Sequence, residues 1–474
     1  MLNSLCIQPE SGQSVKSVDN RSFVKILFLD HTAQLGGGEL ALLSLAQRLD
    51  RRRFHSEVIL FADGPLAAAL RESNIAVEIL PLAESIRTTG RGTLGIGSLA
   101  QLSAVTGSIR FVWRLARHIR QKKPDIIHCN SLKADILGGL AARLAGAKII
   151  WHIRDRIETD YLPAPVVKIF RFLARHVPHE IIANSHATLE TLHLPSSKPS
   201  AVVYSGISTP AAVPNAQCQI PNAKCPILDA EYQNSDSAIT DNTVSVSSVA
   251  NNPEPGILNL EDNNASEALP NSPNSSTNSF VSSCLRGEQS FPVIVLVGRI
   301  SPWKGQDIFI RSAGQVLKTF PDCRFQIVGS ALFGEDALET QLKQLAASLG
   351  VGDRVEFLGF RKDVPEIIAA GTLLVHASTV SEPFGQVIIQ AMAECKPVVA
   401  TRGGGVLEIV DDGVTGLLVP MKDVHAMADA ICKILSNPDQ AAEMGRAGNK
   451  KFLEKFTIEK TIENLQEVYA AMSS

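Results

Sequence analysis

Two cationic side chains in the second half of this 474-residue chain have a spacing that suits a diphosphate. Arg299 and Lys304 lie five positions apart in residues 298–305, GRISPWKG, between an apolar run typical of a strand and an amphipathic run typical of a helix. Arginine offers a planar fork of donors and lysine a point charge, and the first amides of the following helix add further donors. The ordinary alternative is two solvated basic residues at a strand end, so the motif alone is moderately specific.

A carboxylate with a matching role follows in residues 381–401, SEPFGQVIIQAMAECKPVVAT. Glu382 comes just before a Pro-Phe-Gly turn and a helix that begins near Gly385, which predicts a place at the carboxyl end of a sheet. There a carboxylate can accept hydrogen bonds from sugar hydroxyls, and the Phe384-Gly385 backbone can approach a ligand closely. The alternative role for Glu382 is to stabilise the start of that helix.

Alternating apolar runs and amphipathic segments position these side chains. From residue 291 onward, runs such as VIVLVGRI, CRFQIVGS and LLVHAS alternate with helical stretches, and a glycine-rich turn, TRGGGVLEIV, carries Gly404 and Glu408. Near-continuous apolar strands are typical of a parallel sheet covered by helices on both faces. Residues 291–454 are therefore predicted to form a doubly wound domain whose strand-to-helix turns share one rim.

The first half of the chain shows the same alternation, in VKILFLD, SEVILFA, DIIHCNS and KIIWHIRD. It predicts a doubly wound domain over residues 23–207. Two Rossmann-like α/β domains that face each other across a cleft are the expected fold, with ligands between the carboxyl ends of the two sheets. Residues 455–474 are predicted to form a C-terminal helix that packs back on the first domain.

The alternation stops over residues 208–290, which are rich in Asn, Ser and Pro. This insert carries nine acidic residues against Lys224 and Arg286, a net charge of −7 that leaves +4 for the rest of the chain. It cannot bury enough apolar surface to offset its ordering entropy, so we expect it to be disordered, like the tail of residues 1–22. A tolerated insertion at a domain boundary is favoured over a partner-binding arm.

Composition narrows the class of protein. Hydrophobic residues make up 45% of the chain and aromatic residues only 5%, which favours aliphatic α/β packing, and the net charge of −3 gives no reason to expect nucleic acid as a partner. The eight cysteines form no C-x-x-C pair, so neither a zinc site nor a disulfide framework is indicated. The start of the chain lacks the pattern of a signal peptide, and a cytoplasmic protein is expected.

These motifs together resemble the retaining GT-B-fold glycosyltransferases often called group 1. The family pattern reads GR-x4-KG, then E-P-F-G, GG-x-x-E-I-V and D-G-x-T-G-L-L-V, and this chain has GRISPWKG, EPFG, GGVLEIV and DGVTGLLV. The resemblance implies that Arg299 and Lys304 hold the diphosphate of a nucleoside diphosphate sugar and that Glu382 contacts the transferred hexose. It also implies a donor site lined by Phe384, Gly385, Gly404 and Glu408, no cofactor, and transfer to a glycan or lipid-linked acceptor of polysaccharide biosynthesis.

One position departs from the family pattern. The acid that the family places eight residues after the first glutamate, for contact with the nucleotide ribose, is Gln390 here. Eight residues are just over two helical turns, so Gln390 points roughly the same way as the acid would, and its amide can both donate and accept. We expect weaker donor binding or an altered nucleotide preference.

In the first domain, Gly36, Gly37 and Gly38 resemble the family's glycine loop near the diphosphate and acceptor, although Glu39 can also simply favour the helix start. His152, in KIIWHIRD, matches a histidine that the family places at a strand end facing the donor sugar. The alternative is that His152 has a structural role, with its ring hydrogen-bonded to backbone groups at the strand end. Poorer candidates at other strand ends are His128, Asn130 and Ser185.

The chemistry implied by the resemblance is transfer with retention. No D-x-D pair lies at a strand end, and the two cations make a metal ion unnecessary, so we predict metal-independent transfer. A catalytically weakened nucleotide- or glycan-binding scaffold is the alternative that Gln390 suggests, and a hydrolase or epimerase on the same frame is a third.

Two helical stretches of the first domain, residues 108–123 and 166–177, interleave basic and bulky apolar residues, with Arg110, Arg114 and Arg117 on one face. Such helices can lie on anionic lipid at the inner face of a membrane. An ordinary surface helix with a basic stripe is slightly favoured.

Overall fold

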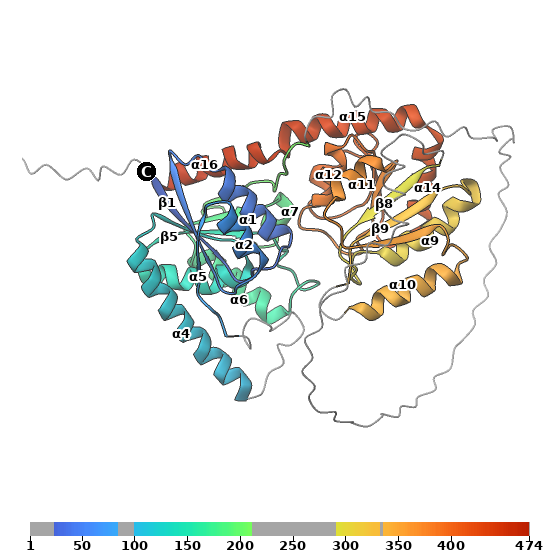
Figure 1. Cartoon of the computed structure of the whole chain (residues 1–474). Coiled ribbons are helices and arrows are strands. Elements are labelled where there is room, and N and C mark those ends of the chain that lie inside the picture. The colour runs from blue at the N-terminus through green and yellow to red at the C-terminus, as the bar shows by residue number, and fades with distance from the viewer. Residues whose placement is uncertain (1–22, 84–98, 211–290, 332–334, 474) are drawn as a thin grey trace, which may run out of the picture.

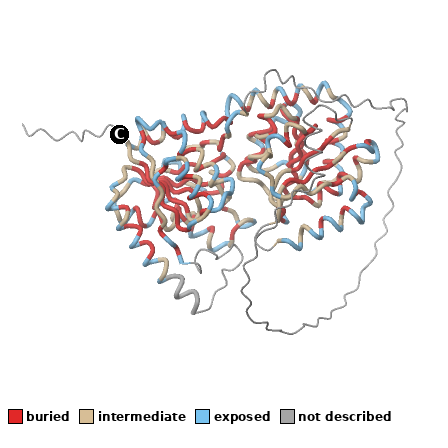
Figure 2. Tube along the Cα trace, in the orientation of Figure 1, coloured by how far each residue is buried: buried red, intermediate tan, exposed pale blue. Residues whose placement is uncertain are grey.

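The computed structural model describes residues 23–83, 99–210, 291–331 and 335–473, and shows two domains side by side (Figure 1). The predicted tail of residues 1–22 and residues 211–290 of the predicted insert lie outside the described residues. Buried residues concentrate around the sheet of each domain (Figure 2), so each domain has its own core.

The first domain is built on a seven-stranded parallel sheet with the order β3-β2-β1-β4-β5-β6-β7. Its strands are β1 (Val24–Asp30), β2 (Phe54–Leu60), β3 (Ala76–Ile79), β4 (Ile126–Cys129), β5 (Lys148–Ile153), β6 (Glu180–Ala183) and β7 (Ser200–Val202). Its helices are α1 (Gly37–Arg48), α2 (Pro65–Glu72), α4 (Leu99–Lys122), α5 (Leu132–Ala145), α6 (Ala164–His176) and α7 (His186–Glu190). The centres of β1, β4 and β5 are fully buried because helices cover both faces.

The second domain has a six-stranded parallel sheet with the order β10-β9-β8-β11-β12-β13. Its strands are β8 (Val293–Val297), β9 (Arg324–Val328), β10 (Val355–Gly359), β11 (Leu373–His376), β12 (Val398–Thr401) and β13 (Leu417–Val419). Its helices are α9 (Gln306–Thr319), α10 (Asp336–Ser348), α11 (Val364–Ala370), α12 (Gln386–Ala393), α13 (Val406–Ile409), α14 (Val424–Ser436) and α15 (Pro438–Lys455). The prediction of two doubly wound, Rossmann-like domains is confirmed.

The strand order sets where a ligand site can form. In the second sheet the order reverses between β8 and β11, which are neighbours although three strand-to-helix connections apart. Open α/β sheets bind ligands at such a switch point, outside the carboxyl ends of the strands. The turn GRISPWKG follows β8 and the turn containing EPFG follows β11, so the fold brings both turns to this point.

The last helix, α16 (Ile458–Ser473), returns to the first domain (Figure 1). Ile462, Leu465 and Tyr469 share a buried cluster with Ile26 and Phe28 of β1. The two passages of the chain between the domains are hydrogen-bonded side by side: the Ile207 amide donates to the Phe456 carbonyl at 3.1 Å, and the Ile458 amide donates to the Ile207 carbonyl at 2.8 Å.

Candidate functional site

Lys304 and Glu382 meet at the switch point of the second sheet. The Lys304 Nζ lies 2.6 Å from Oε1 of Glu382, and the Ser378 hydroxyl donates to the same oxygen at 2.5 Å. His376 at the end of β11 places its Nε2 3.7 Å from that oxygen. Burial alone would raise the pKa of Glu382, but Lys304 and His376 outweigh it and hold this pKa well below its usual range. Glu382 is therefore a carboxylate at neutral pH, with 14% of its side chain exposed and within reach of a ligand.

The GRISPWKG turn is shaped by Gly305. Its φ is 70°, and a Cβ there would lie 2.0 Å from the Ala377 carbonyl oxygen at the end of β11. A larger residue would push the turn away from β11 and separate Lys304 from Glu382. Arg299, on the same turn, holds its guanidinium 5.2 Å from the centroid of the Trp303 ring. The turn thus presents both cations just ahead of the N-terminus of α9.

The turn containing Glu382 rests on the glycine-rich turn after β12. Gly404 has a φ of 61°, and a Cβ on it would lie 2.1 Å from the Glu382 carbonyl oxygen, which accepts a hydrogen bond from the Gly405 amide at 2.9 Å. Gly385, with a φ of 126°, precedes α12. These contacts fix the backbone of Glu382, and with it the starting point of the side chain that bears the carboxylate.

The Phe384 ring is buried at the domain boundary. It stacks on Tyr204 with ring centroids 5.7 Å apart and lies edge-on to Phe456 at 5.9 Å. The ring is packed among these aromatics, so the part of Phe384 suited to approach a ligand is its backbone.

Glu408 reaches into the first domain. Its Oε2 accepts a hydrogen bond from the His186 amide at 2.9 Å and its Oε1 from the Ala187 amide at 2.8 Å, at the start of α7. The Tyr204 hydroxyl donates to Oε2 at 3.1 Å. The carboxylate that the sequence suggested for the donor site therefore joins the two domains.

A second bridge involves Pro383, the neighbour of Glu382. Its carbonyl accepts hydrogen bonds from the Ser185 hydroxyl at 2.5 Å and the Thr188 hydroxyl at 3.0 Å. Ser185 is the N-cap residue of α7, and Thr188 lies in its first turn. The first domain is thus hydrogen-bonded directly to the EPFG turn.

The glycine loop of the first domain lies against the start of α12. A Cβ on Gly37 would come 3.0 Å from Oε1 of Gln386. The loop is held from behind by Asn130, whose Nδ2 donates to the Gly38 carbonyl at 3.2 Å and to Asp30 at 2.7 Å. Of the three glycines, Gly37 therefore lies next to the residue that follows the EPFG turn, whereas a Cβ on Gly36 or Gly38 would meet Glu39 or Arg154 of the first domain. Gln390, one turn further along α12, is half-buried.

His152 belongs to a buried polar cluster of the first domain. Its Nδ1 lies 3.1 Å from Nε2 of His128, and the Tyr469 hydroxyl lies 2.7 Å from Nδ1 of His128. Burial, followed by the charge of Arg154, lowers the pKa of His128 to about 3 and that of His152 well below its usual value. Both rings are neutral at pH 7, and Nε2 of His152 has no hydrogen-bond partner among the described residues.

The sequence reasoning missed Arg154, which ties this cluster together. Its Nε donates to Asn130 at 3.0 Å and its Nη1 to Ser205 at 2.7 Å, while Nη2 lies 3.4 Å from Nδ1 of His152. Arg154 follows His152 by two positions at the end of β5, so both side chains point to one face of the sheet. The two-residue alternation of side chains along a strand was the signal in the sequence that could have identified Arg154 as a neighbour of His152. His376 and Ser378, the partners of Glu382, were missed as well.

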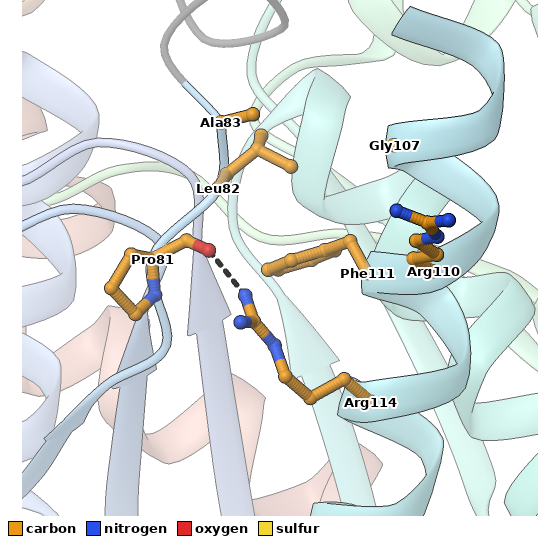
Figure 3. A pocket seen from close by; sticks show the side chains of 7 residues that line it. All are labelled: Pro81, Leu82, Ala83, Gly107, Arg110, Phe111 and Arg114. Atoms are coloured by element: carbon orange, nitrogen blue, oxygen red, sulfur yellow. Dashed lines mark hydrogen bonds between the residues drawn. The ribbon is translucent and has the colours of Figure 1, made fainter. Parts of the chain in front are cut away.

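A separate pocket lies between the segment after β3 and α4, lined by Pro81, Leu82, Ala83, Gly107, Arg110, Phe111 and Arg114 (Figure 3). An Arg114 guanidinium nitrogen donates to the Pro81 carbonyl. The lining holds no carboxylate, thiol or imidazole, so it offers no acid, base or nucleophile.

Two negative findings concern metals and membranes. Within the described ranges, no group of three or more His, Cys, Asp or Glu side chains is arranged to hold a metal ion. The described helices include none with the length and apolar character needed to cross a membrane.

Two family models match the chain. Residues 286–451 match "Glycosyl transferases group 1" and residues 35–210 match "Glycosyltransferase Family 4". Among curated proteins, the alpha-D-kanosaminyltransferase of Streptomyces kanamyceticus is 31% identical over 180 residues, 38% of this chain and 45% of that protein. The GDP-mannose-dependent alpha-(1-6)-phosphatidylinositol monomannoside mannosyltransferase of Mycolicibacterium smegmatis is 36% identical over 173 residues, 35% of this chain and 44% of that protein. The chain thus spans less than half the length of these curated relatives.

Solved structures extend the likeness over both domains. Anabaena Alr3699/HepE, solved in complex with UDP and glucose, is 26% identical with a TM-score of 0.68, and the match covers 94% of this chain and 99% of that one. The two family models fall on the two domains, one on each, and the motifs GRISPWKG and EPFG lie inside the group 1 match. The chain belongs to the group 1 glycosyltransferase family, with the GT-B fold.

Proposed function

We propose that this protein transfers a hexose from a nucleoside diphosphate sugar to a hydroxyl of a glycan or lipid-linked acceptor, with retention and without a metal ion. The observation that carries the proposal is the pairing of Lys304 with the Glu382 carboxylate at 2.6 Å, at the switch point that also presents Arg299. A cation pair for a diphosphate and an ionised acceptor for sugar hydroxyls stand together there. The UDP and glucose in the Anabaena structure make UDP-glucose the first donor to test.

Each residue has a distinct task in this proposal. Arg299 and Lys304 hold the diphosphate and neutralise the charge that develops as it leaves. Oε1 of Glu382 is held by Lys304 and Ser378, and we assign its Oε2 to the hydroxyls of the sugar. Gln390 takes the ribose.

The first domain completes the site. The backbones of Phe384 and Gly385 and the loop of Gly36, Gly37 and Gly38 line the diphosphate and acceptor from opposite domains. We assign His152 to the sugar. The acceptor hydroxyl attacks the anomeric carbon on the face from which the diphosphate departs, the bond from that carbon to the phosphate oxygen breaks, and the departing phosphate takes the hydroxyl proton.

A donor panel tests the proposal. UDP-, GDP- and ADP-sugars are screened for a thermal shift of the full chain and then for release of nucleoside diphosphate. We expect one donor to stabilise the protein and to turn over, and Arg299→Ala to abolish both effects. If no nucleotide sugar stabilises the protein and Arg299→Ala changes nothing, the proposed function is wrong.

A membrane contact of the first domain is a further part of the proposal. Ile109 and Trp113 on α4 are 54% and 58% exposed, and Ile169 and Phe172 on α6 are 57% and 61% exposed. On α4 these apolar side chains alternate with the exposed Arg110, which suits an anionic lipid surface. Pelleting with anionic vesicles that weakens as salt is raised would support contact, and equal pelleting with neutral vesicles would contradict the electrostatic part.

The alternative is a nucleotide- or glycan-binding scaffold with weakened catalysis, and Gln390 is the observation that favours it. A scaffold would show a thermal shift with a nucleotide sugar but no release of nucleoside diphosphate at any enzyme concentration tested.

A further inference from the structure

Three aromatic side chains from distant parts of the chain form a buried hydrogen-bonded row. Tyr469 comes from α16, His128 from β4 and His152 from β5, and their exposed fractions are 0%, 0% and 1%. The Tyr469 hydroxyl lies 2.7 Å from Nδ1 of His128, and Nε2 of His128 lies 3.1 Å from Nδ1 of His152. We call Tyr469, His128 and His152 the aromatic relay.

The direction of these hydrogen bonds is favoured from both ends of the row, by Arg154 and by Tyr469. A guanidinium can only donate, and its Nη2 lies 3.4 Å from Nδ1 of His152, a long contact that favours that nitrogen as an acceptor. At the other end, the buried Tyr469 hydroxyl finds its acceptor, among the described residues, in Nδ1 of His128 at 2.7 Å. The pKa of Arg154, lowered by burial to about 10, still leaves it charged at neutral pH. With Nδ1 of His152 accepting, Nε2 of His128 carries a proton and donates to it. Nδ1 of His128 then accepts a hydrogen bond from the Tyr469 hydroxyl.

This order settles the tautomer of His152, because a neutral imidazole carries one proton. Its N–H is on Nε2, the nitrogen that has no partner among the described residues and is buried. A buried donor without a partner is costly, and a ligand oxygen would relieve that cost. An Nε2 that carries the proton cannot accept one, so this nitrogen is unsuited to act as a general base toward an acceptor hydroxyl.

We infer that Tyr469 and His128 are positioning residues that hold His152 as the Nε2–H tautomer, which donates a hydrogen bond to an oxygen of the bound donor sugar. The inference rests on the proposed function. It makes α16 part of the site: the helix that follows the donor-binding domain returns to the first domain and sets the proton position of a histidine there. If the aromatic relay served only for packing, loss of the Tyr469 hydroxyl would change the stability of the fold and leave the tautomer of His152 unchanged.

The tautomer is read directly by ¹⁵N NMR of the full chain labelled on histidine, with His152→Gln identifying the signals of His152. We expect the wild-type spectrum to show a protonated Nε2 and an unprotonated Nδ1. Tyr469→Phe should give a mixture of tautomers, because only the long 3.4 Å contact from Arg154 then opposes the reversed row. In the same variant we expect kcat to fall about threefold to tenfold, the range of one neutral hydrogen bond, with the donor KM little changed. Tyr161→Phe, which removes the hydroxyl that donates to Asp155 at 2.5 Å in the same domain, is the control and should leave the tautomer unchanged.

A second pair of variants guards against a folding defect in Tyr469→Phe. In His128→Gln the amide can accept from Tyr469 and donate to His152, so the Nε2–H tautomer should persist. His128→Leu leaves only the long Arg154 contact to favour that tautomer and should give a mixture. A wild-type His152 with its proton on Nδ1 would overturn the inference, as would an unchanged tautomer in both Tyr469→Phe and His128→Leu. If no nucleotide sugar turns over, the proposed function fails, but the spectra still decide the tautomer.

Discussion

The hydrogen bonds of Glu408 to the amides of His186 and Ala187 predict that a change at Glu408 weakens the start of α7. The change Glu408→Gln keeps the size of the side chain but replaces one of two accepting oxygens with an amide nitrogen, which can only donate. The His186 and Ala187 amides, now held at 2.9 and 2.8 Å by the two oxygens, cannot both keep their partner. The start of α7 should therefore open more often.

The size of the effect follows from the type of bond that is lost. Hydrogen bonds to a charged group contribute about 1.5–3 kcal/mol and neutral ones about 0.5–1.5 kcal/mol. Glu408 is half-buried, so water compensates part of the loss and the low ends apply. We expect α7 to lose about 1–2 kcal/mol of local stability, which is roughly a 5- to 30-fold change in its opening equilibrium.

Hydrogen exchange of the His186 and Ala187 amides measures this directly, because local opening limits their exchange. Their rates should rise by the same roughly 5- to 30-fold. Glu443→Gln, an exposed carboxylate on α15, is the matched control and should leave them unchanged. Unchanged protection in Glu408→Gln would refute the reasoning. If protection is kept while the Kd for nucleoside diphosphate rises, Glu408 acts in the donor site and not between the domains.

Three further predictions concern the donor side. Gly305→Ala should lower Tm by more than Gly350→Ala. Both glycines have φ near 70°, but only at Gly305 would the new Cβ meet a backbone oxygen at 2.0 Å. Equal losses of Tm would show that the backbone strain of a positive φ, and not the close contact, sets the cost. Gln390→Glu should lower the Kd for nucleoside diphosphate about fivefold by calorimetry, since a hydrogen bond to a charged acceptor gains about 1 kcal/mol over one to a neutral acceptor. The control Gln344→Glu, on the exposed face of α10, should leave this Kd unchanged. Equal effects of the two variants would show that net charge, not a contact at residue 390, changes the affinity. Because the folded-state pKa of Glu382 is lowered, its ionisation stabilises the fold above the unfolded pKa of about 4.3, and this contribution is lost as pH falls through the folded value. The difference in urea midpoint between wild type and Glu382→Gln should therefore shrink from pH 7 to pH 3, and a constant difference would contradict the lowered pKa.

The fold and the donor turns were legible from sequence because their signals are local. Buried parallel strands read as continuous apolar runs, and Gly305 and Gly404 mark places where the backbone passes close to another backbone segment, at Ala377 and at Glu382. Such signals need only a few neighbouring residues. The expectation that Lys304 and Glu382 share one rim followed from the predicted parallel sheet, in which the strand-to-helix turns lie at one edge, and the strand order of the structure makes their two strands neighbours.

The contacts between domains could not be predicted in this way. Glu408 and His186 are 222 positions apart, and Tyr469 and His128 are 341 positions apart. A helix face that bears Tyr469 looks like any amphipathic face until its partner sheet is known. The same holds for Phe384, whose ring is used for packing against Tyr204 while its sequence neighbours serve the site.

The placement of Glu382 depends on both domains at once. Within its own domain, Gly404 and Gly405 fix the Glu382 carbonyl, and from the first domain Ser185 and Thr188 hold the next carbonyl, that of Pro383. Two carbonyls in succession are thus fixed by opposite domains. Any movement of the domains apart must break the hydroxyl bonds to Pro383 before it reaches the backbone of Glu382. The carboxylate that we assign to the sugar is held by Lys304 and Ser378 within the second domain, and docking of the first domain adds two hydrogen bonds to the next residue of the backbone.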